Sequence, residues 1–130
     1  MKRNNTIRFL TWKTFIALFA FDVLGFGHNF AKMHRFVSKL KVSHQTPPPN
    51  VVERVCNAVN NACVWYPKRV RCLQRSAVTN YLLRSYGVRS QMVIGAQKIP
   101  FKAHAWTEVD GHAINEQRNV QSIYGVWERC

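Results

Sequence analysis

Acidic side chains are scarce in this chain. Asp and Glu together number 6 among 130 residues, against 19 Lys and Arg, and the formal net charge is +13. Such a balance points to an acidic partner, such as nucleic acid, an anionic membrane surface or an acidic peptide. It also restricts the chemistry, because any catalytic carboxylate must come from Asp22, Glu53, Glu108, Asp110, Glu116 or Glu128.

Several sequence signals of ligand sites are missing as well. The four cysteines, Cys56, Cys63, Cys72 and Cys130, form no C-x-x-C pair, and no Cys/His group has zinc-finger spacing. No glycine-rich phosphate loop is present, which argues against ATP binding by this chain. We therefore expect neither a metal nor a cofactor. Because 47% of the residues are apolar, a core can form without disulfides, and a reducing cytosol that leaves the thiols free is favoured.

The N-terminal region lacks an apolar run long enough to span a membrane. Met1-Lys2-Arg3 and the apolar run from Phe15 to Phe21 resemble a signal peptide in outline, but small residues at a cleavage site are lacking. Lys13 and Asp22 bracket the run, which falls far short of the roughly 20 apolar residues that a span needs. We expect a buried or amphipathic helix in a cytoplasmic protein. Because basic residues surround it, peripheral contact with the inner face of an anionic membrane is the alternative.

Hydrophobic spacing predicts helices first and strands afterwards. An α+β fold in a single domain, residues 1–130, follows from this order and from the length. Within it we expect a basic helical part over 1–50, with an extended linker at Pro47-Pro48-Pro49, and a core over 51–130. Asp110-Gly111 predicts a tight turn between strands. The expected helices cover 8–25, 28–42, 51–66 and 71–86, and the expected strands cover 88–96, 103–109, 112–115 and part of 122–130.

Two of these helices have a clear apolar face. In the helix over 51–66 it consists of Val51, Val55, Ala58 and Ala62. In the helix over 71–86 it consists of Leu73, Ala77, Val78, Tyr81 and Leu82, and Gly87 follows as a natural C-cap.

One cysteine and one histidine occupy the positions that cysteine-peptidase chemistry needs. That chemistry uses a thiolate, an imidazole that generates it and a third group that orients the imidazole. Cys72 begins the helix expected over 71–86, where unpaired backbone N–H groups favour a thiolate. Arg71 and Arg75 add positive charge beside it. His104 is on the strand expected over 103–109, and we interpret it as the general base and acid, with Cys72 as the nucleophile.

The sequence blocks around these two residues resemble a known family. Over residues 55–118 the chain resembles the stand-alone leader-peptidase half of the lasso-peptide processing B protein, one of the transglutaminase-like, papain-like cysteine peptidases. The resemblance implies a central helix with the cysteine at its N-terminus, packed on an antiparallel sheet. The blocks that carry it are, in order, Arg71-Cys72-Leu73-x-Arg75-Ser76, Tyr86-Gly87-Val88, Val93-Ile94-Gly95 and Pro100-Phe101-x-Ala103-His104-Ala105-Trp106-x-Glu108.

The same resemblance implies an activity and partners. The enzyme removes the leader from a ribosomally made precursor peptide through a thioester acyl-enzyme, which exposes a new amino terminus on the core. A separate ATP-using lasso cyclase then joins that amine to an acidic side chain. Since nothing in this chain resembles a leader-binding domain, we expect a separate leader-binding protein to supply that function. No nucleic-acid partner is expected.

The third member of the triad departs from the family pattern, which places Asp about twelve residues after the histidine. Glu116 occupies that position here, and its side chain is one carbon longer. Its neighbour Asn115 is the alternative, because an amide orients the histidine in papain-type sites. Only one of them can point at His104, since successive side chains of a strand face opposite ways. We favour Glu116 because a carboxylate also stabilises the imidazolium.

Further residues are expected to bind substrate. Trp106 is two residues after His104, so it shares that face of the strand and can shield the catalytic pair from water, with ordinary core packing as the alternative. Gln74 and Trp65 are candidates for the second oxyanion donor, beside the backbone N–H of Cys72. Arg75 belongs to a basic cluster that can guide an acidic leader, with a solvated basic face as the alternative. The other members of this cluster are Arg69, Arg71, Arg84 and Arg89.

Two other functional classes stay open. A transglutaminase-like acyltransferase uses the same triad with an amine in place of water. A non-catalytic module that binds nucleic acid or a peptide is argued from charge alone, because no nucleic-acid-binding motif is present. The departure at Glu116 is the one hint of an inactive relative. Replacing Cys72 by Ala separates these classes, because an enzyme loses its activity and a binding module does not.

Overall fold

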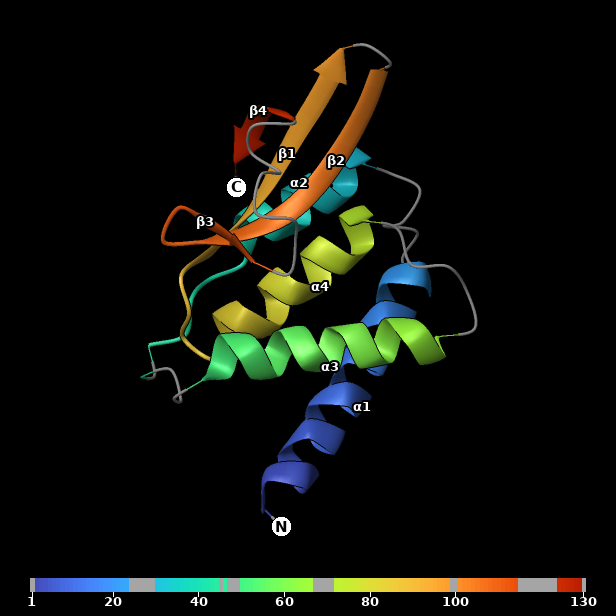
Figure 1. Ribbon diagram of the computed structural model, residues 1–130, viewed down its shortest axis with the longest axis vertical. Helices are drawn as coiled ribbons and strands as arrows, with labels where there is room; N and C mark the ends of the chain where they lie inside the picture. Colours follow the sequence, from blue (N-terminus) through green and yellow to red (C-terminus); the bar gives the residue numbers. More distant parts are fainter. Residues whose placement is uncertain are drawn as a thin grey trace.

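The computed structural model describes residues 2–23, 30–44, 46, 50–66, 72–98, 101–114 and 124–129. Within these residues the helices precede the strands (Figure 1), so the predicted α+β class is confirmed. The predicted linker at 47–49 lies outside the described residues. The elements are α1 (Lys2–Val23), α2 (Phe30–Lys39), α3 (Val51–Trp65), α4 (Cys72–Ser85), β1 (Ser90–Lys98), β2 (Phe101–Val109), β3 (His112–Ile114) and β4 (Gly125–Arg129).

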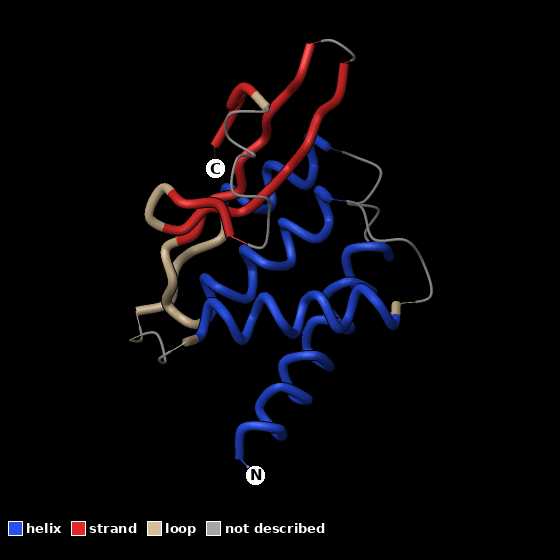
Figure 2. The backbone as a smooth tube through the Cα atoms, viewed as in Figure 1, coloured by secondary structure: helices blue, strands red, loops and turns tan. Residues whose placement is uncertain are grey.

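Helix α4 is the centre of the fold. It contacts α1, α2 and α3 and also β1 and β2, so that helices and sheet enclose it, and Figure 2 shows it between α3 and the strands. Its apolar residues Ala77, Val78 and Leu82 are buried as predicted, but Tyr81, which we expected in the same apolar stripe, is exposed. Polar α4 residues are buried too, because an enclosed helix has little solvent-facing surface. Among them are Gln74, Ser76, Thr79, Asn80 and Arg84.

The end of α4 is fixed by backbone hydrogen bonds around a glycine. Gly87 has φ 89°, a left-handed conformation that a residue without a Cβ adopts at little cost. The N–H of Gly87 donates to the carbonyl of Arg84 at 3.1 Å, and the N–H of Val88 donates to that of Leu83 at 3.0 Å. This is the Schellman pattern, and it confirms the predicted C-cap.

The strands form an antiparallel sheet in the order β3-β2-β1-β4. β1 and β2 are in register from Ser90 opposite Val109 to Lys98 opposite Phe101. Between β2 and β3, Asp110 and Gly111 have φ of 53° and 79°, which confirms the predicted tight turn. β4 pairs with β1 over a shorter stretch, with a register irregularity between Ile94 and Gly95.

The core has a large part and a small part. The large cluster joins the inner faces of the helices to one face of the sheet, where Met92, Ile94 and Ala105 contribute. α3 supplies the predicted stripe, with Val51, Val55, Ala58 and Ala62 buried. The small cluster contains Val93 and Trp106, and Ala113 and Tyr124 pack against it. Because Val93 and Trp106 alternate with residues of the large cluster along their strands, the small cluster lies on the opposite face of the sheet.

Candidate active site

The predicted nucleophile is the first residue of the central helix. α4 begins at Cys72, as the sequence predicts. The first N–H groups of a helix have no intrahelical acceptor and carry partial positive charge, which favours a thiolate at this position. Among the predicted triad, the structure describes the side chain of His104, whereas Glu116 and Asn115 lie outside the described residues. The choice between those two therefore stays a prediction.

His104 belongs to a group of aromatic rings. Its imidazole stacks on Trp106, with ring centroids 5.9 Å apart and an interplanar angle of 26°. Tyr124 belongs to the same group, and its ring centroid is 5.3 Å from that of His104 and 6.3 Å from that of Trp106. The histidine is half-buried, whereas the tryptophan is almost completely buried. Both rings contact the imidazole, and part of the histidine stays accessible.

A buried carboxylate fixes the tryptophan of this group. The indole Nε1 of Trp106 donates to Oε2 of Glu108 at 2.8 Å, and Glu108 is 2% exposed. The two residues are on alternate positions of β2 with His104, so all three side chains leave the same face of the strand. The prediction that Trp106 shares the face of His104 is therefore confirmed. Glu108 therefore holds in place the indole on which His104 stacks.

The described contacts put His104 and the body of α4 on different faces of the sheet. Thr107, the neighbour of Trp106, faces α4: its hydroxyl accepts a hydrogen bond from Nδ2 of Asn80 at 3.0 Å and donates to the carbonyl of Ser76 at 3.3 Å. Ala105 joins the large core on the same side. His104 and Trp106 leave β2 in the opposite direction. A Cys72–His104 pair must therefore form at the end of α4 rather than along its side.

A glycine makes room for the tryptophan. Gly95 of β1 lies opposite His104 in the register. A Cβ at this position would lie 2.6 Å from Cη2 and 2.8 Å from Cζ3 of Trp106, and 2.9 Å from Cβ of Tyr124. The indole thus lies directly over the backbone of Gly95, in space that any other residue would fill. Packing at the ring group therefore explains the glycine of the Val93-Ile94-Gly95 block.

Two of the predicted substrate-binding residues contact neighbouring helices. Nε2 of Gln74 donates to the carbonyl of Leu18 at 3.1 Å and to Oδ1 of Asp22 at 3.3 Å, so both amide hydrogens point at α1. The guanidinium of Arg75 donates to Oδ1 of Asn60 on α3. These contacts use both side chains to join helices, and the candidate roles of Gln74 in the oxyanion hole and of Arg75 in substrate binding stay predictions. The physical reason for the contacts is that α4 is enclosed, so its polar side chains are used to join the helices.

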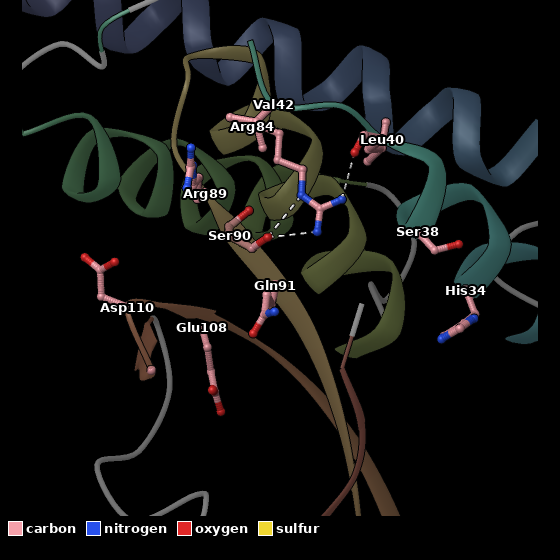
Figure 3. A pocket seen from close by; sticks show the side chains of 11 residues that line it. His34, Ser38, Leu40, Val42, Arg84, Arg89, Ser90, Gln91, Glu108 and Asp110 are labelled. Atoms are coloured by element: carbon pink, nitrogen blue, oxygen red, sulfur yellow. Dashed lines mark hydrogen bonds between the residues drawn. The ribbon is translucent and has the colours of Figure 1, made fainter. Parts of the chain in front are cut away.

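Arg84, another member of the predicted basic cluster, also joins elements of the fold. Arg84 is buried and donates to three backbone carbonyls, those of Val37 (2.6 Å), Leu40 (3.2 Å) and Ser90 (2.8 and 3.1 Å). Figure 3 shows its guanidinium between Leu40 and Ser90, at the wall of a cavity of about 690 Å³. Arg84 thereby joins α2, α4 and β1. Arg89, which also lines this cavity, is exposed.

The two cysteines of α3 are poor nucleophiles. Burial raises the pKa of the Cys56 thiol and that of the Cys63 thiol, and the positive charge of Arg75 offsets part of that effect. Both are free thiols. A raised pKa keeps a thiol protonated at neutral pH and lowers its reactivity. The start of α4, at Cys72, therefore stays the predicted position of the nucleophile.

No metal centre is visible in the part of the chain that the structure describes: its His, Cys, Asp and Glu residues form no group of three or more with suitable geometry. Sequence reasoning did not foresee the role of Glu108 as the acceptor for Trp106. The alternation of His104, Trp106 and Glu108 was the available signal, because alternate residues share one face of a strand.

Comparisons with known proteins agree with this architecture. The chain matches the model of the Transglutaminase-like superfamily over residues 17–127. It is 36% identical over 55 residues to the microcin J25-processing protein McjB of Escherichia coli, a match that covers 42% of this chain and 26% of McjB. No solved structure matches the chain significantly. The family match covers most of the sequence and contains α4 and strands β1 to β3, so the chain belongs to the transglutaminase-like superfamily.

Proposed function

We propose that this chain is a cysteine peptidase that removes the leader from a ribosomally made lasso-peptide precursor. One observation carries the proposal: a chain of the transglutaminase-like superfamily that is similar to a microcin J25-processing protein has a cysteine as the first residue of its central helix. In this proposal a separate leader-binding protein presents the precursor, and a lasso cyclase acts on the product. The precursor and these two proteins are the proposed partners.

The proposed chemistry has two steps. The thiolate of Cys72 attacks the carbonyl carbon of the leader–core bond, and the C–N bond breaks as His104 gives a proton to the departing amine of the core. The leader then remains on Cys72 as a thioester. His104 takes a proton from water, the resulting hydroxide displaces the thiolate, and the leader leaves as a carboxylate. No oxidant, metal or nucleotide is consumed.

Two features of the fold would support these steps. The backbone N–H of Cys72, at the start of α4, is the proposed first donor to the oxyanion of the tetrahedral intermediate. On the other side, the stack of His104 on Trp106 limits the motion of the imidazole, and the hydrogen bond to Glu108 holds the indole in place. Glu116, or Asn115 as the alternative, is the proposed group that orients His104.

The proposal places a geometric demand on His104. Its side chain leaves β2 on the face opposite the body of α4, so the imidazole must reach the sulfur of Cys72 around the N-terminal end of that helix. Thiol alkylation measures whether it does. We expect the pH dependence of the Cys72 alkylation rate to show a depressed thiol pKa in the wild type and a higher thiol pKa in His104→Ala. An unchanged pH profile would show that the two groups do not interact.

Cleavage itself is tested by mass spectrometry of a lasso precursor incubated with this protein and a leader-binding protein. Wild type, Cys72→Ala and the matched control Cys56→Ala are compared, because Cys56 is half-buried on α3 and has no proposed role. We expect cleavage at one site by wild type and Cys56→Ala, and none by Cys72→Ala. A product joined to an added amine would identify an acyltransferase instead. Absence of cleavage by folded wild type, with leader bound, would refute the peptidase proposal.

A further inference from the structure

The outer face of α1 carries a row of large apolar side chains that the fold leaves exposed. They follow each other at spacings of three and four residues, which places them along one face of a helix. Each is 63–69% exposed, so none contributes appreciably to the core. We refer to this row as the α1 stripe. It consists of Phe9, Trp12, Ile16, Phe19 and Val23.

The stripe is not required by the core of the protein. The opposite side of α1 already packs inward through buried residues such as Leu10, Leu18 and Phe21. Part of the stripe, from Phe9 to Ile16, also precedes residue 17, where the match to the transglutaminase-like superfamily begins. Monomeric proteins rarely expose a continuous apolar patch of this kind without an interaction that covers it. A binding role is therefore the physical explanation to test.

The surface around the stripe is apolar and open. A hollow of about 410 Å³ is lined by Trp12, Phe15, Ile16, Phe19 and Tyr66. Another hollow, of about 400 Å³, lies on the other side of Ile16. Figure 1 shows that the first half of α1 extends beyond α3, away from the sheet, so this helix is a projecting part of the molecule. A flat or soft partner can therefore approach along its length.

Charge decides which partner fits. The chain has a net charge of +13, and the α1 segment itself contains Lys2, Arg3, Arg8 and Lys13. Its single acid, Asp22, already accepts hydrogen bonds from Tyr66 and Gln74. A second copy of this chain would bring like charges together. Anionic lipid headgroups complement the charge, and the acyl boundary accepts exposed Trp, Phe and Ile side chains.

We propose that the α1 stripe binds the surface of an anionic lipid bilayer. None of the helices in the described part of the chain is long and apolar enough to cross a membrane, so the contact is peripheral. Gln74 of α4 donates to Leu18 and Asp22 of α1, and it is two residues after Cys72. A bilayer-bound α1 therefore holds the beginning of α4 near the lipid surface. The binding itself does not depend on peptidase activity.

Co-sedimentation of the full chain with vesicles tests the proposal. Vesicles of phosphatidylcholine alone are compared with vesicles that also contain phosphatidylglycerol, at low and high salt. The variants are Ile16→Ser and Trp12→Ser/Phe19→Ser, with Val64→Ser as the matched control. Val64 of α3 is an exposed aliphatic residue (77%) outside the stripe. Cys72→Ala is included to separate vesicle binding from catalysis, and circular dichroism verifies that each variant is folded.

We expect the wild type, Val64→Ser and Cys72→Ala to bind vesicles that contain phosphatidylglycerol, with binding weakened by salt. Ile16→Ser should bind roughly tenfold more weakly, and the double variant should bind more weakly still, because each removes an apolar side chain from the lipid contact. Equal binding by Ile16→Ser and wild type would overturn the proposal. The proposal would also be overturned if the wild type did not bind vesicles and instead self-associated, or bound an acidic protein, in a way that the stripe variants abolish.

Discussion

Gly95→Ala is the change that tests the ring group around His104 most directly. The added methyl carbon would lie 2.6 Å from Cη2 of Trp106, whereas ordinary van der Waals contacts of a Cβ are 3.4–4 Å. The indole cannot move away freely, because its Nε1 is bound to Glu108 and its ring is almost completely buried. Overpacking of this kind costs typically about 1–3 kcal/mol of unfolding free energy. We expect a loss in the upper part of that range.

A double-mutant cycle assigns the cost to the tryptophan. A phenyl ring lacks the two indole carbons, Cζ3 and Cη2, that are nearest to the added methyl group. Gly95→Ala should therefore cost less in the Trp106→Phe background than in the wild type, by at least about 1 kcal/mol, a coupling typical of residues in contact. Urea unfolding gives the four free energies, and near-UV circular dichroism follows the aromatic packing.

The outcome of this cycle discriminates clearly. Additive costs would show that the indole does not lie over Gly95, and the described position of Trp106 beside His104 would be wrong. A negligible cost of Gly95→Ala in the wild type would lead to the same conclusion. A large coupling would establish that Gly95 determines where the ring group lies, and hence where the imidazole of His104 is held.

Three further predictions concern the helical layer. Arg84→Met should lower the free energy of unfolding, measured in urea, by about 2–4 kcal/mol, because three carbonyls lose a buried donor. The control Arg89→Met, at an exposed residue, should change it by less than about 0.5 kcal/mol. Equal effects of the two substitutions would contradict the described hydrogen bonds. Burial, and then the hydrogen bond and charge of the neighbouring carboxylate, raise the pKa of Tyr66 from 10.0 to about 12. Its folded pKa exceeds the unfolded one, so the stability difference between wild type and Tyr66→Phe should be constant below pH 10 and shrink towards pH 12; a pH-independent difference would refute this. Iodoacetamide should label Cys56 and Cys63 slowly at neutral pH and faster as pH rises, because burial raises both pKa values; rapid labelling of either in peptide mass spectra at pH 7 would contradict their described burial.

The sequence was sufficient for the elements whose patterns are local. Spacings of three and four predicted the buried stripe of α3, from Val51 to Ala62, because helix geometry alone decides which residues share a face. Gly87 and Asp110-Gly111 predicted a helix end and a tight turn, since both need backbone conformations with positive φ. The beginning of α4 at Cys72 was predicted for the same local reasons.

The residues that joined different elements could not be predicted in this way. Polar and charged residues are usually exposed, so the position of Gln74, Arg75 and Arg84 near Cys72 in the sequence suggests contact with substrate. In the structure these side chains form hydrogen bonds with neighbouring helices, because α4 is enclosed. The enclosure of α4 is a property of the assembled fold. The sequence also could not predict which face of β2 packs on α4. Both alternating rows, Ala105 with Thr107 and His104 with Trp106, contain residues that can be buried.

The two alternating rows of side chains on β2 make different contacts, and this difference bears on the proposed mechanism. Thr107 attaches the strand to α4, so it fixes how far along the helix β2 lies. His104 and Trp106 belong to the other row, whose position is set by Gly95 and by the hydrogen bond to Glu108. A change in the first row should therefore alter the distance between His104 and Cys72, with little effect on the stacking of the rings. A change in the second row should alter the imidazole while α4 stays in place. Thr107→Val and Gly95→Ala thus test separate requirements of the proposed catalytic pair: the first changes where the histidine would meet the cysteine, and the second changes how the histidine is held.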